Sequence, residues 1–411
     1  MDNPLTHSEV TVIGGGMIGA ATALGLAQAG FRVTVAELQA PAPFDAQSRP
    51  DVRISAISRA SAELLESLAV WERVRAMRCV PYRTLETYEE PGSEVTFTAE
   101  SLGLPELGYM VENPVLQRAL WEMITAHELI TCLCPARLQS MTKQSGEWLL
   151  TFDNGDVISS RLVIGADGAK SQVRTLAGIG SRGWQYRQSC MLITVDTGRE
   201  QQDITWQQFF PSGPRAFLPL FDSYASLVWY DSPARIRQLS KLPLPQLQAE
   251  IRASFPERLG DVTPLAYGSF PLVRHHAACY VQDGLALIGD AAHTINPLAG
   301  QGVNLGFMDV AELIGEIRRL TAEGKDNGNY FWLRRFERRR KQSAAMMLAG
   351  MQGFRELFDG SNPVKKLVRD VGLVLADTLP GVKPALLRHA RGLSDMPDWL
   401  REPKPASAEK I

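Results

Sequence analysis

The sequence predicts an α/β fold that becomes α+β where a sheet-rich segment is inserted. Two observations predict it. An apolar, β-branched run at residues 10–13 precedes a glycine turn and a run of helix-forming residues, and residues 32–35 then return as a second strand. Two later apolar runs, 162–164 and 285–288, also end at turns of glycine and aspartate. Strands that alternate with helices are typical of parallel sheets.

The glycine turn after the first strand has the spacing of a dinucleotide-binding loop. Gly14, Gly16 and Gly19 lie between this strand and a helix that ends at Gly30. Such glycines permit a tight turn and let the backbone approach a pyrophosphate at a helix N-terminus. Glu37 follows 18 residues after Gly19, at the end of the second strand, where a carboxylate can bind ribose hydroxyls. A turn selected only for packing is the alternative.

The segments between and after the motifs predict further elements. Residues 41–50 form a proline-rich loop, residues 58–77 have helical spacing, and another helix is expected over residues 113–127. Residues 184–270 alternate in the manner of strands and are rich in aromatic side chains. The chain after about residue 330 is expected to be helical. Because the first unit resumes near residue 285, we expect it to be discontinuous in sequence.

The strand at residues 162–164 leads into a turn that contains Asp167 and Gly168. Small residues flank Asp167, which gives a ligand access to the backbone. An ordinary Asp-Gly turn between strands is the alternative explanation. Ser171 and Arg174 follow at fixed offsets and favour a binding site over that alternative.

The strand at residues 285–288 leads into the most informative stretch, residues 289–304. Asp290 follows the strand directly, and a glycine-rich turn then opens a helix near Gly302. A carboxylate suits a sugar-like hydroxyl, and free amides at a helix start suit developing negative charge. This combination predicts a cofactor site.

Composition argues against several classes of protein. The 411 residues carry a net charge of −2, which gives no whole-chain attraction to nucleic acid. Five scattered cysteines lack the paired spacing of a zinc site, so no metal is expected and a reduced, cytoplasmic protein fits best. Residues 1–9 do not resemble a signal peptide, and no stretch reaches the roughly 20 apolar residues that span a bilayer. Any membrane contact would be peripheral, at the inner face.

Together, the three motifs resemble those of the flavoprotein aromatic hydroxylases, the single-component FAD monooxygenases related to para-hydroxybenzoate hydroxylase. The resemblance extends from about residue 10 to about residue 358. It implies a Rossmann-like FAD-binding domain of that type, an inserted sheet-rich substrate domain and a helical C-terminal region. It also implies FAD as cofactor, NAD(P)H as electron donor and O2 as co-substrate. The boundaries that we expect are residues 1–78, 104–183 and 271–330 for the FAD-binding domain, 79–103 and 184–270 for the substrate domain, and 331–411 for the C-terminal region.

The resemblance also implies roles for individual residues. The glycine turn would hold the adenosine and pyrophosphate, and the Asp-Gly turn is associated with both FAD and the nicotinamide donor. Asp290 would bind the ribitol, and the residues from Pro297 onward would border the isoalloxazine ring. The matching cofactor-binding positions are Gly14, Gly16, Gly19, Glu37, Arg53, Gln117, Asp167, Gly168, Asp290, Pro297, Gly300, Gly302, Val303 and Asn304.

Within that family the chain is most similar to the hydroxylases of ubiquinone biosynthesis. Residues 53–58 and 293–302 carry their pattern, as do residues 188–193, 205–209 and 226–235 of the sheet-rich part. The implied substrate is a polyprenylated methoxy-methyl-benzoquinol. The alternatives are a hydroxylase of another ring position, a hydroxylase of a soluble phenol, and a non-catalytic FAD-binding component. Contacts with a membrane surface, with other ubiquinone-biosynthesis proteins or with a second copy of the chain stay open, and no nucleic acid partner is expected.

The sequence does not identify a catalytic base. His293 and Pro297 are candidates because they lie near the expected flavin edge. A structural role for His293, in which it bonds to a nearby carbonyl and holds the turn, is at least as well supported, because geometry must precede pKa in such an assignment. The basic run at residues 334–341 predicts a solvated helix face, with contact to anionic lipid as the alternative.

Overall fold

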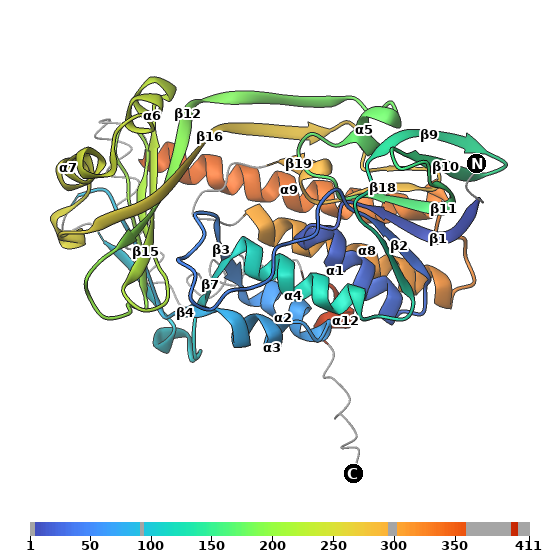
Figure 1. Cartoon of the computed structure of the whole chain (residues 1–411), viewed down its shortest axis with the longest axis horizontal. Helices are drawn as coiled ribbons and strands as arrows, with labels where there is room; N and C mark the ends of the chain where they lie inside the picture. Colours follow the sequence, from blue (N-terminus) through green and yellow to red (C-terminus); the bar gives the residue numbers. More distant parts are fainter. Residues whose placement is uncertain (1–4, 91–93, 295–301, 359–395, 402–411) are drawn as a thin grey trace, which may run out of the picture.

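The first βαβ unit forms as the sequence predicts. β1 (Thr6–Ile13) leads through the glycine turn into α1 (Met17–Gln28), and the chain returns as β2 (Val33–Ala36). β1 pairs in parallel with β2 and, on its other side, with β11 (Val157–Gly165). The computed structural model describes residues 5–90, 94–294, 302–358 and 396–401, and its arrangement is shown in Figure 1.

The parallel sheet brings the three sequence motifs to one edge. Its strand order is β17-β18-β11-β1-β2-β8. Gly165 lies opposite Ile13 on one side and Leu287 on the other, so β1, β11 and β18 end level with one another. The turns that follow them therefore meet at the carboxyl edge, where ligands bind in open α/β sheets. The other strands are β8 (Ile130–Leu133), β17 (Val281–Gln282) and β18 (Leu285–Leu287), with an antiparallel extension of β9 (Leu138–Gln144) and β10 (Glu147–Phe152).

Helices pack closely beside this sheet. α1 contacts both α4 (Asn113–Thr125) and α8 (Gly302–Ala322). A Cβ at Gly25 would lie 2.2 Å from Ile314 Cδ1, so this glycine permits α1 and α8 to approach each other. The helical stretch expected at residues 58–77 consists of two helices, α2 (Arg59–Ser67) and α3 (Trp71–Met77). They are separate because the chain turns at Ala69, which has a φ of 59°.

A second, eight-stranded sheet contains the strands predicted in the sheet-rich segment. Its strand order is β19-β16-β12-β15-β14-β13-β5-β6. The bounds are β5 (Thr84–Tyr88), β6 (Val95–Thr98), β12 (Ser181–Asp196), β13 (Ile204–Gln208), β14 (Arg215–Pro219), β15 (Tyr224–Asp231), β16 (Thr263–Ala277) and β19 (His293–Thr294). β5 pairs with β13, so part of residues 79–103 joins the same sheet as residues 184–270.

The long strands β12 and β16 connect the two halves of the molecule. Figure 1 shows them side by side, running from the second sheet toward α5 (Gln172–Leu176), and they are 16 and 15 residues long. The expected domain boundaries after residues 183 and 270 fall inside these continuous strands. The division into two domains stays a prediction.

The two faces of the second sheet have different neighbours. One face packs against α6 (Pro233–Leu239) and α7 (Leu244–Ser254). The opposite face packs against a three-stranded sheet of β3 (Ile54–Ser58), β7 (Gly108–Glu112) and β4 (Val80–Tyr82). Side chains alternate along β12, so that Met191 and Ile193 join the first cluster and Cys190 and Leu192 the second.

Helix α9 (Tyr330–Phe358) packs along α8 through a ladder of ion pairs. The pairs are Arg335 with Glu316 (3.8 Å), Arg339 with Glu312 (2.6 Å) and Arg340 with Asp309 (2.6 Å). Their reversed order shows that the two helices are antiparallel. The prediction of a solvated basic face is therefore wrong for Arg340, which is 2% exposed because acids on α8 attract it. Arg334 and Arg338 are exposed, as expected.

The remaining described elements are short. They are η1 (Glu100–Leu102), η2 (Glu257–Leu259), η3 (Gly289–Ala291) and α12 (Asp398–Arg401). α12 returns to α8, where Trp399 Nε1 donates a hydrogen bond to the Ala311 carbonyl. Within the described ranges, no helix is long and apolar enough to cross a membrane, and no group of three or more His, Cys, Asp or Glu side chains could hold a metal ion.

Candidate functional site

The three glycines of the first turn serve two different purposes. A Cβ at Gly14, whose φ is +101°, would lie 2.5 Å from the Ala166 carbonyl oxygen, and a Cβ at Gly19 would lie 1.8 Å from the Gly14 oxygen. These two positions require glycine for packing. A Cβ at Gly16 would meet nothing within 4 Å. Gly16 is the N-cap of α1 and provides no side-chain cap, so no cap side chain occupies the amides of the first turn.

Glu37 is fixed beside this turn. Its Oε2 accepts a hydrogen bond from the Gly15 amide at 2.6 Å, and its Oε1 accepts from the amides of Leu38 and Gln39 at 2.8 and 3.1 Å. Helix α4 also approaches this turn, since a Cβ at Gly15 would lie 2.6 Å from Trp121 Cζ3. Gln117 precedes Trp121 by one turn of α4, which brings it to the same region.

Arg53 lies at the start of α4, close in the backbone to Gln117. The Arg53 carbonyl accepts a hydrogen bond from the Asn113 amide at 2.9 Å. The Arg53 amide donates to Asp51 Oδ1 at 2.7 Å, and its guanidinium is exposed and lies 3.6 Å from the same oxygen. Arg53 therefore lies at the N-terminus of the helix that carries Gln117.

The Asp-Gly turn has a structural role and also an unused polar atom. Asp167 Oδ2 accepts hydrogen bonds from the amides of Gln172 and Val173, at 2.7 and 3.1 Å, and so caps α5. Among the described residues, the buried Asp167 Oδ1 has no hydrogen-bond partner. Gly168 has a φ of +78°, and a Cβ there would meet nothing within 4 Å. The turn is thus an ordinary capped turn on one side and open to a ligand on the other.

Arg174 connects the Asp-Gly turn at Asp167 to the turn that contains Asp290. Its Nη1 donates to the Ala291 carbonyl at 2.8 Å, and its Nη2 donates to the Ala169 carbonyl at 2.9 Å. Burial lowers the pKa of Arg174, and nearby Asp167 opposes that shift. The guanidinium therefore holds two turns that are more than a hundred residues apart in the chain in one fixed arrangement.

Asp290 is presented by the short helix η3. Its side chain is exposed, although the protein packed around the carboxylate desolvates it and raises its pKa. Asp309 raises that pKa further, whereas His293 lowers it. A carboxylate in this setting gains from a hydrogen-bond donor such as a hydroxyl group.

His293 is part of a buried ion-pair network. Its Nε2 lies 2.6 Å from Asp309 Oδ2, which also accepts the Gly289 amide at 2.8 Å, and Arg340 Nε donates to Asp309 Oδ1 at 2.6 Å. Burial raises the pKa of Asp309, but the charges and hydrogen bonds of His293 and Arg340 outweigh it and the net pKa is lowered. His293 is 3% exposed. These contacts support its structural role, with a carboxylate as partner in place of the expected carbonyl.

The helix start expected near Gly302 is present as the first residue of α8. Val303 and Asn304 follow in its first turn. The Asn304 side chain is committed elsewhere, because its Nδ2 donates to the Ala56 carbonyl at 2.8 Å and its Oδ1 accepts the Ser58 amide at 2.9 Å. These two bonds hold the Asn304 side chain against the backbone of β3. Pro297 and Gly300 lie outside the described residues.

Comparison with known proteins agrees with this geometry. A family model described as an FAD binding domain matches residues 7–350. The 3-demethoxyubiquinol 3-hydroxylase of Escherichia coli is 55% identical over 94% of this chain and 99% of its own length. The ubiquinone hydroxylase UbiL of Rhodospirillum rubrum is 32% identical over 94% of this chain and 90% of its own. This chain belongs to the FAD-dependent monooxygenases.

Solved structures of such monooxygenases share the fold. The p-nitrophenol 4-monooxygenase PnpA from Pseudomonas putida DLL-E4 matches with a TM-score of 0.76, at 17% identity, over 95% of this chain and 99% of its own. An aklavinone-11 hydroxylase in complex with FAD and aklavinone matches with a TM-score of 0.68, over 84% of this chain and 68% of its own. At these identities the likeness concerns the fold alone.

The residues of this monooxygenase fit FAD, its cofactor. The open position at Gly16 matches a pyrophosphate, and Glu37 directly follows β2, where a ribose would lie. Asp167 Oδ1 is a buried acceptor without a partner among the described residues, and Asp290 is an exposed carboxylate at the same sheet edge.

An apolar cluster lies where the small sheet of the monooxygenase meets the second sheet. We call it the inner cluster. Its buried members are Ile54, Ala56, Val80, Met110, Cys190, Ala216, Leu218, Leu220, Val228, Tyr230 and Leu272. Burial raises the pKa of Tyr82, beside the cluster, to about 12, and that of Tyr230 well above its ordinary value. Both phenols therefore stay protonated at neutral pH.

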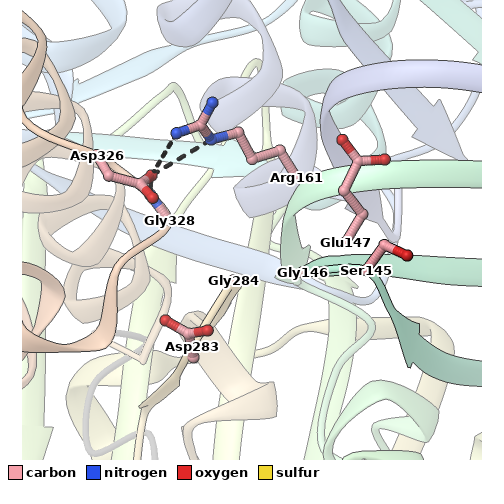
Figure 2. A pocket seen from close by; sticks show the side chains of 8 residues that line it. All are labelled: Ser145, Gly146, Glu147, Arg161, Asp283, Gly284, Asp326 and Gly328. Carbon is pink, nitrogen blue, oxygen red and sulfur yellow. Dashed lines mark hydrogen bonds and ion pairs between the residues drawn. The ribbon is translucent and has the colours of Figure 1, made fainter.

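A polar cavity of about 220 Å³ lies away from the motifs. It is lined by Ser145, Gly146, Glu147, Arg161, Asp283, Gly284, Asp326 and Gly328, as Figure 2 shows. Asp283 and Gly284 immediately precede β18, whereas Asp290 follows it. The cavity is therefore at the amino edge of the sheet, opposite the cofactor edge, and the Arg161–Asp326 ion pair crosses it.

Sequence reasoning missed Asp309, Arg340 and Arg78. Asp309 carries the one signal that could have been used, since it is a lone acid in an otherwise apolar stretch of a predicted helix. A charge at such a position is rarely buried unless it is paired. Arg340 stands between Arg339 and Lys341, and Arg78 directly follows a predicted helix, so neither carries a comparable signal.

Proposed function

We propose that this enzyme hydroxylates the ring of a demethoxyubiquinol, a polyprenylated methoxy-methyl-benzoquinol, with NAD(P)H and O2. The observation that carries the proposal is the 55% identity to the 3-demethoxyubiquinol 3-hydroxylase of Escherichia coli, which extends over 99% of that protein. The aligned length includes the second sheet, whose inner face would meet the substrate. Bound FAD, once reduced, supplies the chemistry that inserts an oxygen atom from O2 into an electron-rich ring.

We propose that the carboxyl edge of the parallel sheet holds the nucleotide part of FAD. The amides after Gly16 bind the pyrophosphate, and Glu37 accepts the ribose hydroxyls. Gly14 and Gly19 permit that approach without touching the ligand. Arg53, Gln117, Asp167 and Gly168 complete the set of proposed cofactor contacts.

In this proposal, the stretch of residues 289–304 binds the flavin end of FAD. Asp290 binds the ribitol, and the amides of Gly302, Val303 and Asn304 point toward the carbonyl edge of the flavin ring. A helix N-terminus there favours negative charge on that edge. Pro297 and Gly300 are proposed to border the ring as well.

The inner cluster would receive the quinol ring and exclude water. The proposed substrate domain, residues 79–103 and 184–270, supplies most of it, and residues of the proposed FAD-binding domain complete it. Gly108 is needed here, because a Cβ at this position would lie 2.7 Å from the Tyr82 hydroxyl. The protonated phenol of Tyr82 can donate a hydrogen bond to a substrate oxygen and is a poor base. A quinol already carries an electron-donating hydroxyl, which reduces the need for one.

The decisive experiment identifies the quinone intermediate that accumulates in cells that lack this protein. A demethoxyubiquinone is expected, and restoring the gene should remove it. The Rattus norvegicus relative, 30% identical over 93% of this chain and 90% of its own, is named a ubiquinone biosynthesis monooxygenase, so another ring position is the competing outcome. Accumulation of an earlier phenol would support that competitor. Purified protein should be yellow and should release FAD on denaturation.

We also propose that the enzyme reaches its polyprenylated substrate at a membrane surface or within an assembly of ubiquinone-biosynthesis proteins. Phe331 and Met346 on α9 are 65% and 50% exposed, and Arg334 and Arg338 are exposed on the same helix. Apolar and cationic side chains together suit an anionic lipid surface. Flotation with anionic vesicles should detect the contact, and size-exclusion chromatography would show whether the chain forms homo-oligomers instead.

A further inference from the structure

Arg78 is a buried arginine that has no part in the proposed cofactor contacts. It follows the last residue of α3, and it is 9% exposed. Its Nη1 donates to Glu112 Oε1 at 3.1 Å. Its Nη2 is shared among four acceptors, the carbonyls of Asp45, Ala46 and Ser48 and the Ser48 hydroxyl, at 2.6–3.3 Å. Burial of a guanidinium is costly unless it is paired and hydrogen-bonded, as it is here.

On the cofactor side, Arg78 binds the chain segment that leads to Arg53. The carbonyls that it binds belong to the proline-rich loop between β2 and β3. Its partner Glu112 accepts the Asp51 amide at 2.6 Å through the other carboxylate oxygen. Asp51 in turn accepts the Arg53 amide. A continuous chain of hydrogen bonds therefore runs from Arg78 to the proposed FAD contact at Arg53.

On the substrate side, Arg78 contacts the second sheet. Its guanidinium carbon lies 4.2 Å from the ring centroid of Phe221 and 5.1 Å from that of Phe44. Phe221 lies between β14 and β15 and packs against the inner cluster, and its ring meets Tyr224 edge to face at 5.2 Å. Phe44 belongs to the proline-rich loop. One side chain thus joins an aromatic ring of the substrate-facing sheet to the loop that leads to Arg53.

We propose that Arg78 is a positioning residue that ties the segment leading to Arg53 to the substrate-facing sheet at Phe221, and so aligns the flavin with the ring to be hydroxylated. This inference rests on the proposed function. A planar guanidinium suits the role because it presents several donors in one plane and stacks on aromatic rings at the same time. A lysine could keep the charge beside Glu112 but could not reproduce both contacts.

The experiment tests separately the hydrogen bonds of Arg78 toward Arg53 and its contact with Phe221. Phe221→Leu removes the aromatic ring and keeps an apolar side chain beside the inner cluster, Arg78→Lys keeps the charge, and Arg78→Met removes the guanidinium. Arg75→Met is the matched control, because Arg75 lies on the helix that Arg78 follows, is exposed and pairs with nearby Glu72 at 3.4 Å. For each full-length protein we would measure melting temperature, the FAD dissociation constant of the apoprotein, and the ratio of NAD(P)H oxidised to quinol hydroxylated.

Misalignment of flavin and ring should waste reduced cofactor. We expect Phe221→Leu to raise the NAD(P)H-to-product ratio by about twofold or more with little change in FAD affinity, and Arg78→Met to weaken FAD binding by about fivefold as well. Arg78→Lys should lie between, and Arg75→Met should match the wild type. If Arg78→Met does not fold, Phe221→Leu and Arg78→Lys decide.

An unchanged ratio in both Phe221→Leu and Arg78→Lys would overturn the inference, as would a fall in melting temperature with normal FAD affinity and normal coupling. A wild-type protein that binds FAD but hydroxylates no quinol would instead overturn the proposed function. The FAD titrations of the Arg78 variants would still report on the cofactor side in that case.

Discussion

The carboxyl edge of the parallel sheet and the inner face of the second sheet are built to hold ligands by different means. At the sheet edge, backbone amides and a few carboxylates are placed by glycines such as Gly14, where no other residue fits. On the inner face, apolar side chains alternate along the strands. Leu192 and Cys190 point into the inner cluster, whereas the equally apolar Met191, between them, points to the opposite face. A cofactor with fixed charges needs fixed partners, whereas an apolar ring needs only volume and shape. The first requirement leaves a motif in the sequence and the second does not.

The largest effect is expected on stability, at the buried ion pair of Asp309 and Arg340 near the cofactor edge. Arg340→Met leaves the Asp309 carboxylate, which is 1% exposed, without its arginine. Loss of one partner of a buried ion pair should lower the free energy of unfolding by about 3–5 kcal/mol. Urea denaturation measures this. The control is Arg338→Met on the exposed side of α9, which should change stability by no more than about 0.5 kcal/mol. Equal effects of the two substitutions would contradict the buried network.

The next effect concerns backbone geometry at the cofactor edge. Gly14→Ala places a Cβ 2.5 Å from the Ala166 carbonyl oxygen at a φ of +101°. We expect a loss of about 1–3 kcal/mol in stability and protein that is purified without flavin colour. Gly180→Ala is the control, because its Cβ would meet nothing within 4 Å and it has no positive φ. Retention of full flavin absorbance by Gly14→Ala would show that the turn can move aside.

The same contrast explains what the sequence could and could not predict. Gly14, Asp167 and Asp290 were placed correctly at strand ends, because glycine spacing after an apolar strand reflects local backbone geometry. The pairing of Asp309 with Arg340 could not be predicted, since it joins two helices whose packing depends on the whole fold. The break at Ala69 is also not predicted by the sequence, because alanine rarely adopts a positive φ.

Asp290 tests the cofactor edge without disturbing the core. Asp290→Ala removes an exposed carboxylate, so the apoprotein should fold as the wild type does. Loss of the charged acceptor for a ribitol hydroxyl should weaken FAD binding by about tenfold or more. Fluorescence titration of the apoprotein measures the dissociation constant. Asp283→Ala, at the opposite end of β18, is the matched control and should bind FAD normally. Unchanged FAD affinity in Asp290→Ala would remove the ribitol role.

Two neighbouring residues of β12 test the inner face. Leu192→Ala opens the inner cluster, so the KM for the quinol should rise by about three- to tenfold while FAD affinity stays normal. Met191→Ala alters the opposite face, where Met191 is fully buried, and should lower stability by about 2–5 kcal/mol without a comparable change in KM. Steady-state kinetics at several quinol concentrations would separate the two. A larger KM effect for Met191→Ala would place the substrate on the wrong face of the sheet.

The smallest effect is the pH dependence of stability at Asp290, for which the buried Asp309 is the contrast. Desolvation raises the pKa of Asp290 in the folded protein, so its ionised form opposes folding above the ordinary carboxyl pKa. Asp290→Asn removes that charge, and the variant apoprotein should gain stability over the wild type as pH rises toward neutrality. The difference should vanish as pH falls below the ordinary carboxyl range. Asp309 has a lowered pKa and contributes stability that is lost as pH falls, so Asp309→Asn should be less stable than the wild type at neutral pH. Urea unfolding of the three apoproteins between acidic and neutral pH measures both trends, and a wild type more stable than Asp290→Asn at neutral pH would show that a partner in the protein already stabilises the Asp290 charge.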